Sequence, residues 1–108
     1  MPKEYGLSYL PDFHNDLNET VQYISVSLGN PIAASDLIDK VEKAILKRLE
    51  CPEAFEPYQS LKERAWPYYR IYVDNYVIYY VVIHESDGTK TMEVRRFLYG
   101  GRDRAGLI

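Results

Sequence analysis

The sequence of 108 residues contains only one cysteine, Cys51, and only two histidines, His14 and His84. A single thiol cannot close an internal disulfide, which excludes the disulfide-stapled folds of small secreted proteins. These three side chains are distant in the sequence and match no metal-ligand spacing. We therefore expect no metal site, and we expect a chain that works in a reducing compartment, the cytoplasm.

Long hydrophobic runs are also lacking. The longest uninterrupted apolar stretch is Tyr76–Ile83, eight residues, whereas a membrane-spanning helix needs about 20. The first 13 residues include Glu4 and Asp12 and contain no apolar run of the length that a signal peptide requires. These absences predict a soluble protein with no membrane partner.

Glycine-rich phosphate-binding motifs are missing as well. The six glycines form no GxGxxG, no P-loop and no nucleophile elbow. The sequence therefore predicts no nucleotide cofactor. No internal repeat is present, and a chain of this length has room for a single domain, which we place over residues 1–108.

Positive charge is scarce in the first half of the chain. Residues 1–60 carry five basic and ten acidic side chains, a balance of −5, whereas residues 61–108 carry eight basic and six acidic ones, a balance of +2. Four arginines lie within ten positions near the end: Arg95, Arg96, Arg102 and Arg104. Such a cluster favours phosphates or an acidic partner, because arginine offers a rigid fork of donors. The alternative is a solvated strand end with ion pairs to a helix.

Tyrosine is the residue that the sequence has in excess, with 11 copies. A tyrosine has a flat apolar body and one polar tip, so it suits a surface that is half core and half contact site.

The first half of the chain predicts two amphipathic helices. The first, over residues 11–28, begins at Pro11 and has an apolar stripe at spacings of three and four: Phe13, Leu17, Val21, Ile24 and Leu28. Gly29-Asn30-Pro31 ends it and starts the second, which runs to about Glu50. The predicted inner face of the second helix comprises Ala34, Leu37, Ile38, Val41, Ala44, Ile45 and Leu49. The short connector makes the pair an antiparallel hairpin.

Strands account for most of the remaining pattern. Residues 4–9 predict a first short strand, and residues 52–66 a loop. Alternation or β-rich composition then predicts three strands, Tyr68–Val73, Tyr76–Ile83 and Thr91–Tyr99, joined by turns at Asp74-Asn75 and Ser86–Thr89.

This order predicts a two-layer α+β domain: a strand, a helix hairpin, and a three-stranded antiparallel meander. Helices with one apolar side each need a sheet face to bury against, so we expect both on one face of a mainly antiparallel sheet. The opposite face should then be open, with tyrosine and arginine side chains offered to a partner.

Short motifs occur along the whole chain in a recognisable order. The helices carry Asp16-Leu17, Tyr23-Ile24, Val41-Glu42-Lys43-Ala44-Ile45 and Leu49, followed by Pro52. The meander carries the most specific set, Tyr69-Arg70, Val73, Asn75-Tyr76, Ile78, Tyr80 and Val82, and the end carries Val94, Arg96, Leu98, Gly101 and Arg102-Asp103. In this order the chain resembles the RelE/ParE toxin superfamily over nearly its whole length.

The resemblance implies the toxin of a type II toxin–antitoxin, or plasmid stabilisation, system, a growth inhibitor neutralised by a short antitoxin that wraps it. RelE-like members are metal-independent endonucleases that cut mRNA on the ribosome, and ParE-like members bind DNA gyrase. A third interpretation is a non-toxic protein of the same fold that serves only as an antitoxin's binding partner.

Cutting RNA without a metal requires a base, an acid and fixed cations. The residues that could serve in a RelE-like enzyme are Arg70, Arg102 and His84. Val77 stands where a basic residue often follows the tyrosine of the motif, and no tyrosine follows Arg102. Arg70 could equally be a structural arginine, and Arg102 could pair with Asp103. The incomplete set favours the ParE-like interpretation.

The remaining candidates form a predicted antitoxin or target face, comprising Tyr72, Tyr79, Arg95, Arg96, Tyr99 and Arg104. Aromatic residues and arginine dominate the anchors of protein interfaces, although exposed tyrosines could also stack on RNA bases. Tyr69, Tyr76 and Tyr80 are expected in the core or at its edge. Arg95 and Arg96 point to opposite faces of one strand, so at most one can share a face with Arg70.

Overall fold

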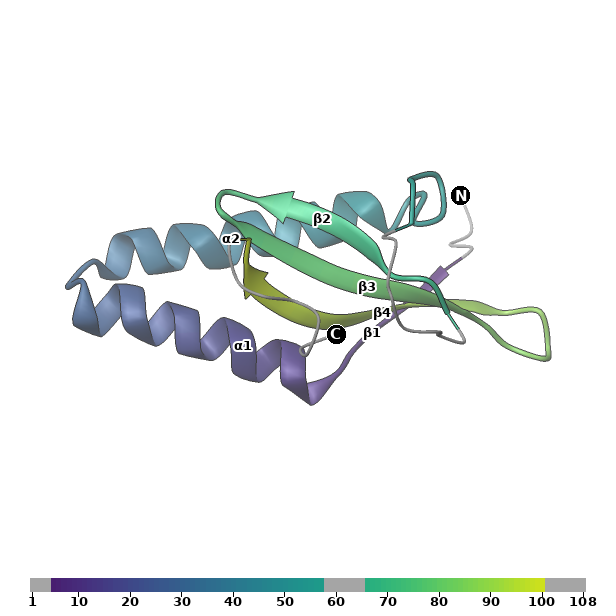
Figure 1. Ribbon diagram of the computed structural model, residues 1–108, viewed down its shortest axis with the longest axis horizontal. Helices are drawn as coiled ribbons and strands as arrows, with labels where there is room; N and C mark the ends of the chain where they lie inside the picture. Colours follow the sequence, from purple (N-terminus) through teal and green to yellow (C-terminus); the bar gives the residue numbers. More distant parts are fainter. Residues whose placement is uncertain (1–4, 58–65, 101–108) are drawn as a thin grey trace.

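The computed structural model describes residues 5–57 and 66–100, and it confirms the α+β architecture (Figure 1). A pair of helices packs against one face of a four-stranded sheet, and the tip of the helix pair extends past the end of the sheet. The elements in chain order are β1 (Tyr5–Tyr9), α1 (Pro11–Gln22), the π-helical turn η1 (Tyr23–Ser27), α2 (Pro31–Arg48), β2 (Tyr69–Val73), β3 (Tyr76–His84) and β4 (Lys90–Tyr99).

The first helix is shorter than predicted, because a π-helical turn replaces its last part. The Leu28 amide donates to the carbonyl of Tyr23, five residues back, at 2.9 Å. A π-turn adds a residue to the helical turn and so rotates the side chains after it about the helix axis. Phe13 is buried as expected, but Leu28, predicted on the same apolar stripe, is 59% exposed. Placing Leu28 on the inner face was therefore wrong.

The second helix begins as the sequence predicts. Gly29 has a φ of +62°, a left-handed conformation that suits a helix end, and the Asn30 side chain accepts a hydrogen bond from the Ala33 amide at 3.1 Å. The buried residues of α2 are Ala34, Leu37, Val41 and Ile45. Ile38, predicted on the same face, is 40% exposed instead. The helix ends at Arg48, close to the predicted end.

The strands follow the order β1-β4-β3-β2, so the meander is confirmed and β1 joins its outer side. The β1 strand runs parallel to β4, and the other neighbours are antiparallel. Both predicted turns are present, with Asp74 at a φ of +52° and Gly88 at +93°. A bulge between Tyr79 and Tyr80 in the register of β3 with β4 leaves Arg95 as the extra residue of β4.

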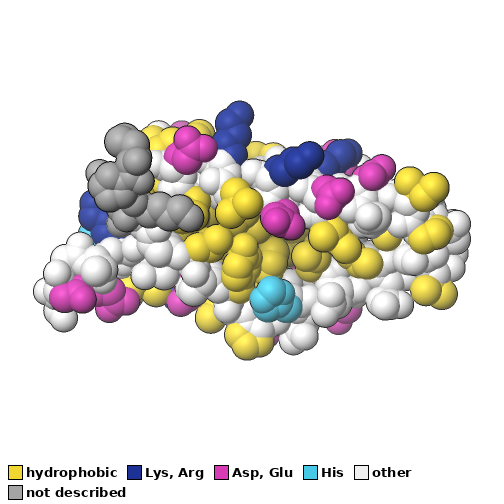
Figure 2. Space-filling view, turned by 180° about the vertical axis from the view of Figure 1, so that it is seen from behind, with side chains coloured by type: hydrophobic (Ala, Val, Ile, Leu, Met, Phe, Trp, Pro, Cys, Tyr) yellow, Lys and Arg dark blue, Asp and Glu magenta, His cyan; other side chains and the backbone are white. Residues whose placement is uncertain are grey.

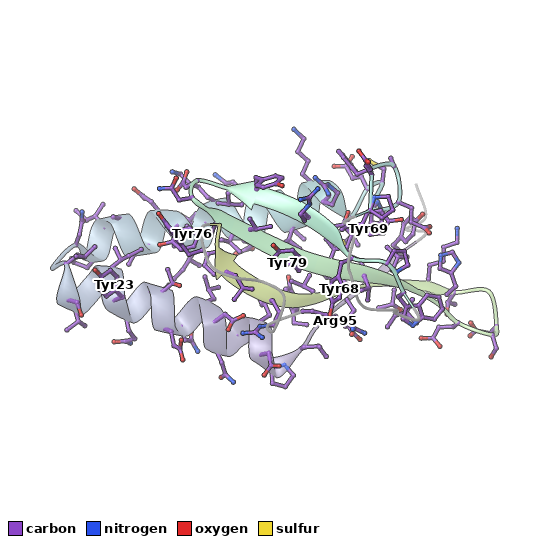
Figure 3. All side chains as sticks on the ribbon, viewed as in Figure 1. Tyr23, Tyr68, Tyr69, Tyr76, Tyr79 and Arg95 are labelled. Atoms are coloured by element: carbon purple, nitrogen blue, oxygen red, sulfur yellow. The ribbon has the colours of Figure 1, made fainter. Side chains whose placement is uncertain are left out.

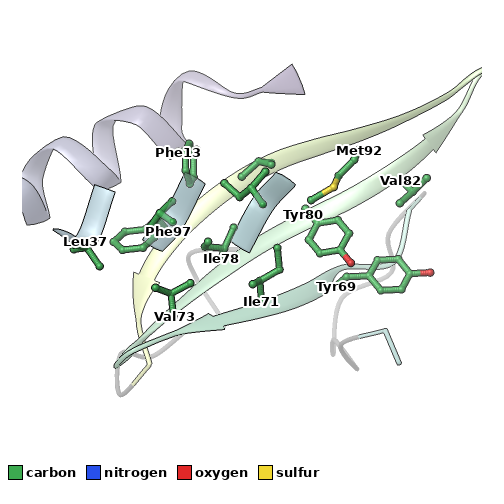
Figure 4. Close-up of a cluster of buried hydrophobic side chains, with 13 residues drawn as sticks. Phe13, Leu37, Tyr69, Ile71, Val73, Ile78, Tyr80, Val82, Met92 and Phe97 are labelled. Atoms are coloured by element: carbon green, nitrogen blue, oxygen red, sulfur yellow. The ribbon is translucent and has the colours of Figure 1, made fainter. Parts of the chain in front are cut away.

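The main core lies between the helices and the sheet (Figure 4). It joins Phe13 and Leu37 from the helices with Ile78, Tyr80 and Phe97 from the sheet in one cluster. The Phe13 ring stands edge-on to that of Phe97, with the ring centroids 6.4 Å apart. This core fixes the helix pair on the sheet, as expected from the apolar stripes.

The other face of the sheet is not open, which corrects a prediction. A second cluster of buried side chains lies there: Tyr68, Val77, Tyr79, Val81 and Leu98, with Trp66 and Ile83 packed against it. The reason is visible in β3, whose residues from 77 to 82 are all buried, on both faces. An apolar strand of this kind needs cover on each side.

Candidate functional site: the partner-binding surfaces

Arg96 is engaged by the first helix rather than offered to a partner. Its guanidinium donates two hydrogen bonds to the Asp16 carboxylate, at 2.7 and 2.9 Å. The Asp16 and Arg96 side chains are 11% and 20% exposed. The hydrogen bonds to Asp16 are the largest cause of the raised pKa of Arg96. Arg96 therefore matches the alternative prediction, an arginine that forms an ion pair with a helix.

Asp16 also completes the edge of β4. The β1 strand ends at Tyr9, opposite Val94, and the Leu10 amide still donates to the carbonyl of Val94 at 2.9 Å. Beyond that point the Asp16 carboxylate accepts a hydrogen bond from the Phe97 amide at 3.0 Å. The Asp16 carboxylate therefore binds both the Phe97 amide at the edge of β4 and the Arg96 guanidinium.

Arg95, the bulged residue of β4, lies beside Tyr68 (Figure 3). It donates to the Glu93 carboxylate at 2.8 Å and to the Tyr68 hydroxyl at 3.4 Å. Its side chain is 27% exposed. Burial lowers the pKa of Arg95, but the hydrogen bonds with Tyr68 and Glu93 outweigh it and raise the pKa overall. Arg95 retains some exposed surface for a partner, although two of its donor groups are engaged by Glu93 and Tyr68.

The three predicted contact tyrosines differ in their exposure to solvent. Tyr72 and Tyr99 are exposed, by 65% and 54%. Tyr79 is 0% exposed and lies in the second cluster, edge-on to Tyr68 (Figure 3). The prediction that Tyr79 belongs to the contact face is therefore wrong, because the same face of the sheet that was expected to be open is covered. Tyr69 and Tyr80 are buried, as predicted.

Tyr72 and Tyr99 border a hollow where three strands end. It has a volume of about 290 Å³ and is also lined by Tyr76, Asp74 and Asn75. The Gly100 amide donates to the carbonyl of Asn75 at 2.8 Å, which ties the end of β4 to the β2–β3 turn. This hollow is a concave site next to two residues of the predicted contact face, Tyr72 and Tyr99.

The helix pair carries a second exposed apolar surface at its tip. Val26, Leu28 and Ile32 are 71%, 59% and 74% exposed. Figure 2 shows apolar side chains gathered at this end and along the middle of the face that the helices form. Exposed apolar groups that gather in this way mark contact sites with other proteins.

His84 is held by a carboxylate that the sequence pattern did not indicate. Its Nε2 lies 2.7 Å from Glu53, which also accepts a hydrogen bond from the Tyr5 hydroxyl at 2.8 Å. Lys90 lies 3.8 Å from the same carboxylate. Burial raises the pKa of Glu53, but these hydrogen bonds and the positive charges outweigh it, so the pKa is lowered. The cluster joins the segment after α2 to β1, β3 and β4.

Glu53 predicts an acid-dependent loss of stability. Because its pKa is lower in the folded state, its carboxylate stabilises the fold above the ordinary pKa of 4.5, and this contribution disappears as the pH falls below that value. We expect the stability difference between the wild type and Glu53→Gln, measured by urea unfolding, to shrink from pH 6 to roughly pH 3. The exposed Glu56, replaced by glutamine, is the matched control. Equal pH profiles for the two variants would refute the role given to Glu53.

The residues proposed for RNA cleavage are not brought together. Arg70 lies on β2 opposite Tyr79, and His84 follows Tyr79 five positions further along β3. At about 3.3–3.4 Å per residue along a strand, the two residues are more than about 15 Å apart. The Arg70 guanidinium instead lies over the Tyr72 ring, 5.8 Å from its centroid. Arg102 and Arg104 lie outside the described residues.

Arg48 is a third residue whose role the sequence did not reveal. Its position predicts only a charge that suits the end of a helix. In the structure it donates to the Arg70 carbonyl and the Tyr80 hydroxyl, both at 2.9 Å, and lies over the Phe55 ring at 3.6 Å. Asp16, Glu53 and Arg48 all act on residues distant in the sequence, so no local pattern could have assigned these contacts.

No helix within the described residues is long and apolar enough to cross a membrane. In residues 5–57 and 66–100, no group of three or more histidine, cysteine or acidic side chains could hold a metal ion.

The strand order and the helix pair define an α+β protein of the RelE-like fold. The chain belongs to the family of ParE toxins of type II toxin–antitoxin systems (parDE), whose model matches residues 7–104. No curated protein matches the chain. A solved structure described as the chromosomal ParDE TA system from P. aeruginosa is similar to it, with a TM-score of 0.68 at 11% identity, covering 91% of this chain and 98% of that one. At this identity the structural likeness supports the fold alone.

Proposed function

We propose that this toxin inhibits bacterial growth in the cytoplasm by binding DNA gyrase, and that a cognate antitoxin neutralises it by covering its exposed surfaces. The observation that carries the proposal is the separation of Arg70 from His84 on the sheet. A metal-independent nuclease needs its base and its cation at one phosphate. A binding protein has no such requirement.

The exposed surfaces have the composition of protein contacts. Tyr72 and Tyr99 offer large rings that are more than half exposed, and the helix tip adds Val26 and Ile32. Tyrosines are enriched among the residues that dominate binding energy, since they bury much area at little cost in conformational entropy. We assign Tyr72 and Tyr99 to the contact with the antitoxin or the target, with Arg95 at the margin.

Controlled expression in a bacterium tests the proposal. We expect growth arrest with a DNA-damage response and intact mRNA, relieved when the antitoxin is co-expressed. The double variant Tyr72→Ala, Tyr99→Ala should lose growth arrest or its relief, because at least one partner then loses its anchors. Glu85→Ala, at an exposed position beside the other hairpin turn of the sheet, is the control and should behave as the wild type.

The outcomes separate the three interpretations. Rapid, codon-positioned cleavage of mRNA would refute the gyrase proposal and favour a ribosome-dependent nuclease. The absence of any growth effect, with the antitoxin still bound, would instead favour a non-toxic binding partner of the antitoxin.

A further inference from the structure

The hollow at the β2–β3 turn, which belongs to the contact face, combines aromatic walls with a carboxylate. Its volume of about 290 Å³ falls below the usual range of small-molecule sites, roughly 300–1,000 Å³. It is therefore suited to one side chain of a partner rather than to a whole ligand.

Three tyrosines border the hollow: Tyr76 and Tyr99 on the helix-covered face of the sheet, and Tyr72, which pairs with Val77, on the opposite face. The Tyr76 ring stacks on Phe97 with centroids 4.8 Å apart and stands edge-on to Tyr99 at 5.9 Å. Tyr99 and Tyr72 remain more than half exposed. The faces of such rings carry partial negative charge and attract cations.

The carboxylate at the rim belongs to Asp74 in the turn. Its side chain is 49% exposed, and Lys40 of α2 places its ammonium 3.2 Å away. Both partners are largely exposed, so the pair contributes little energy and can be exchanged. Burial raises the pKa of Tyr76, and Tyr99, Asp74 and Tyr23 raise it further. These causes keep the Tyr76 hydroxyl neutral, so the charge that a cation would meet at the rim is that of Asp74.

We infer that this hollow receives an arginine side chain from a protein partner of the toxin. Arginine fits better than lysine, because its planar guanidinium can stack on a tyrosine ring while it donates to a carboxylate. Lys40 pairs with the Asp74 carboxylate in the free toxin, so the incoming arginine must displace its ammonium. The inference rests on the proposed function, since it names the chemistry by which a partner is recognised on the contact face.

The full chain, labelled with ¹⁵N, can be titrated with N-acetyl-arginine amide and followed by amide chemical shifts. N-acetyl-citrulline amide has the same shape without the charge. We expect saturable shifts at Asp74, Asn75 and Tyr99, and an affinity for the arginine probe about tenfold above that for the citrulline probe, the size expected of combined cation–π and surface ion-pair contacts.

Variants at the rim sharpen the test. Asp74→Asn should weaken arginine binding about tenfold, and asparagine tolerates the positive φ of this position. Lys40→Ala should strengthen binding, because the competing ammonium is gone. Glu85→Gln removes an exposed carboxylate beside the other hairpin turn and should change nothing. Equal binding of the two probes, shifts only elsewhere, or unchanged binding by Asp74→Asn would each overturn the inference.

The two proposals fail in different ways. Growth arrest relieved by the antitoxin, together with no preference for the arginine probe, would overturn this inference and leave the toxin function standing. Arginine binding at the hollow without growth arrest would overturn the toxin function and leave this inference standing.

Discussion

Replacing Asp16 by asparagine should lower the free energy of unfolding by about 2–3 kcal/mol, a value between those for exposed and buried ion pairs. The asparagine keeps the shape but loses the charge that Arg96 and the Phe97 amide share. Arg96 would then be left four-fifths buried with a weakened acceptor, since its side chain is only 20% exposed. Urea denaturation measures the loss.

The control for this prediction is Asp39→Asn, on the exposed side of α2. Substitutions at such surface sites usually change stability by no more than about 0.5 kcal/mol. A double-mutant cycle with Arg96→Met isolates the ion pair, and we expect a coupling of about 1–2 kcal/mol between the two sites. Equal losses for Asp16→Asn and Asp39→Asn would mean that the carboxylate does not hold the strand edge.

Replacing Arg48 by methionine should lower the free energy of unfolding by about 2–3 kcal/mol. The methionine keeps the aliphatic stem but removes both hydrogen bonds, to the Arg70 carbonyl and the Tyr80 hydroxyl. Hydrogen bonds from a charged donor are each worth about 1.5–3 kcal/mol, and the cation–π contact with Phe55 adds about 0.5–1. Methionine packing in the same place offsets part of this sum.

Lys47→Met is the matched control, because Lys47 lies in the same last turn of α2 and is exposed. It should change stability by less than about 0.5 kcal/mol. Tyr80→Phe should be less harmful in the Arg48→Met background than in the wild type, since the Tyr80 hydroxyl bonds both to Arg48 and to the Pro52 carbonyl, at 2.9 and 2.7 Å. Purely additive effects would contradict a shared network.

Most of the fold could be predicted because its signals are local. Pro11, Gly29-Asn30-Pro31 and the Asp74-Asn75 turn mark the ends of elements through their own backbone preferences, and each is found where expected. The spacing of apolar residues likewise predicts most of the buried face of the two helices, with Leu28 and Ile38 as the exceptions. The π-turn at Tyr23–Ser27 was missed because it changes the helical period, yet its sequence contains no proline or glycine that would mark such a change.

The site was harder to predict, because it depends on tertiary contacts. Tyr72, Tyr79 and Tyr99 look alike in the sequence, yet only Tyr79 lies within the second cluster. Arg96 was named as a contact residue, and its partner Asp16 lies 80 positions away. Burial and pairing of this kind follow from the packing of whole elements, so a single sequence can propose candidates but cannot separate buried ones from exposed ones.

The central claim is that this ParE-family toxin acts by binding gyrase rather than by cutting RNA. The most direct measurement is the DNA supercoiling activity of purified gyrase from the bacterium that encodes the toxin, titrated with the purified chain. We predict that supercoiling falls as the toxin is added, and that the antitoxin restores it. Full supercoiling activity in the presence of excess folded toxin would contradict the claim.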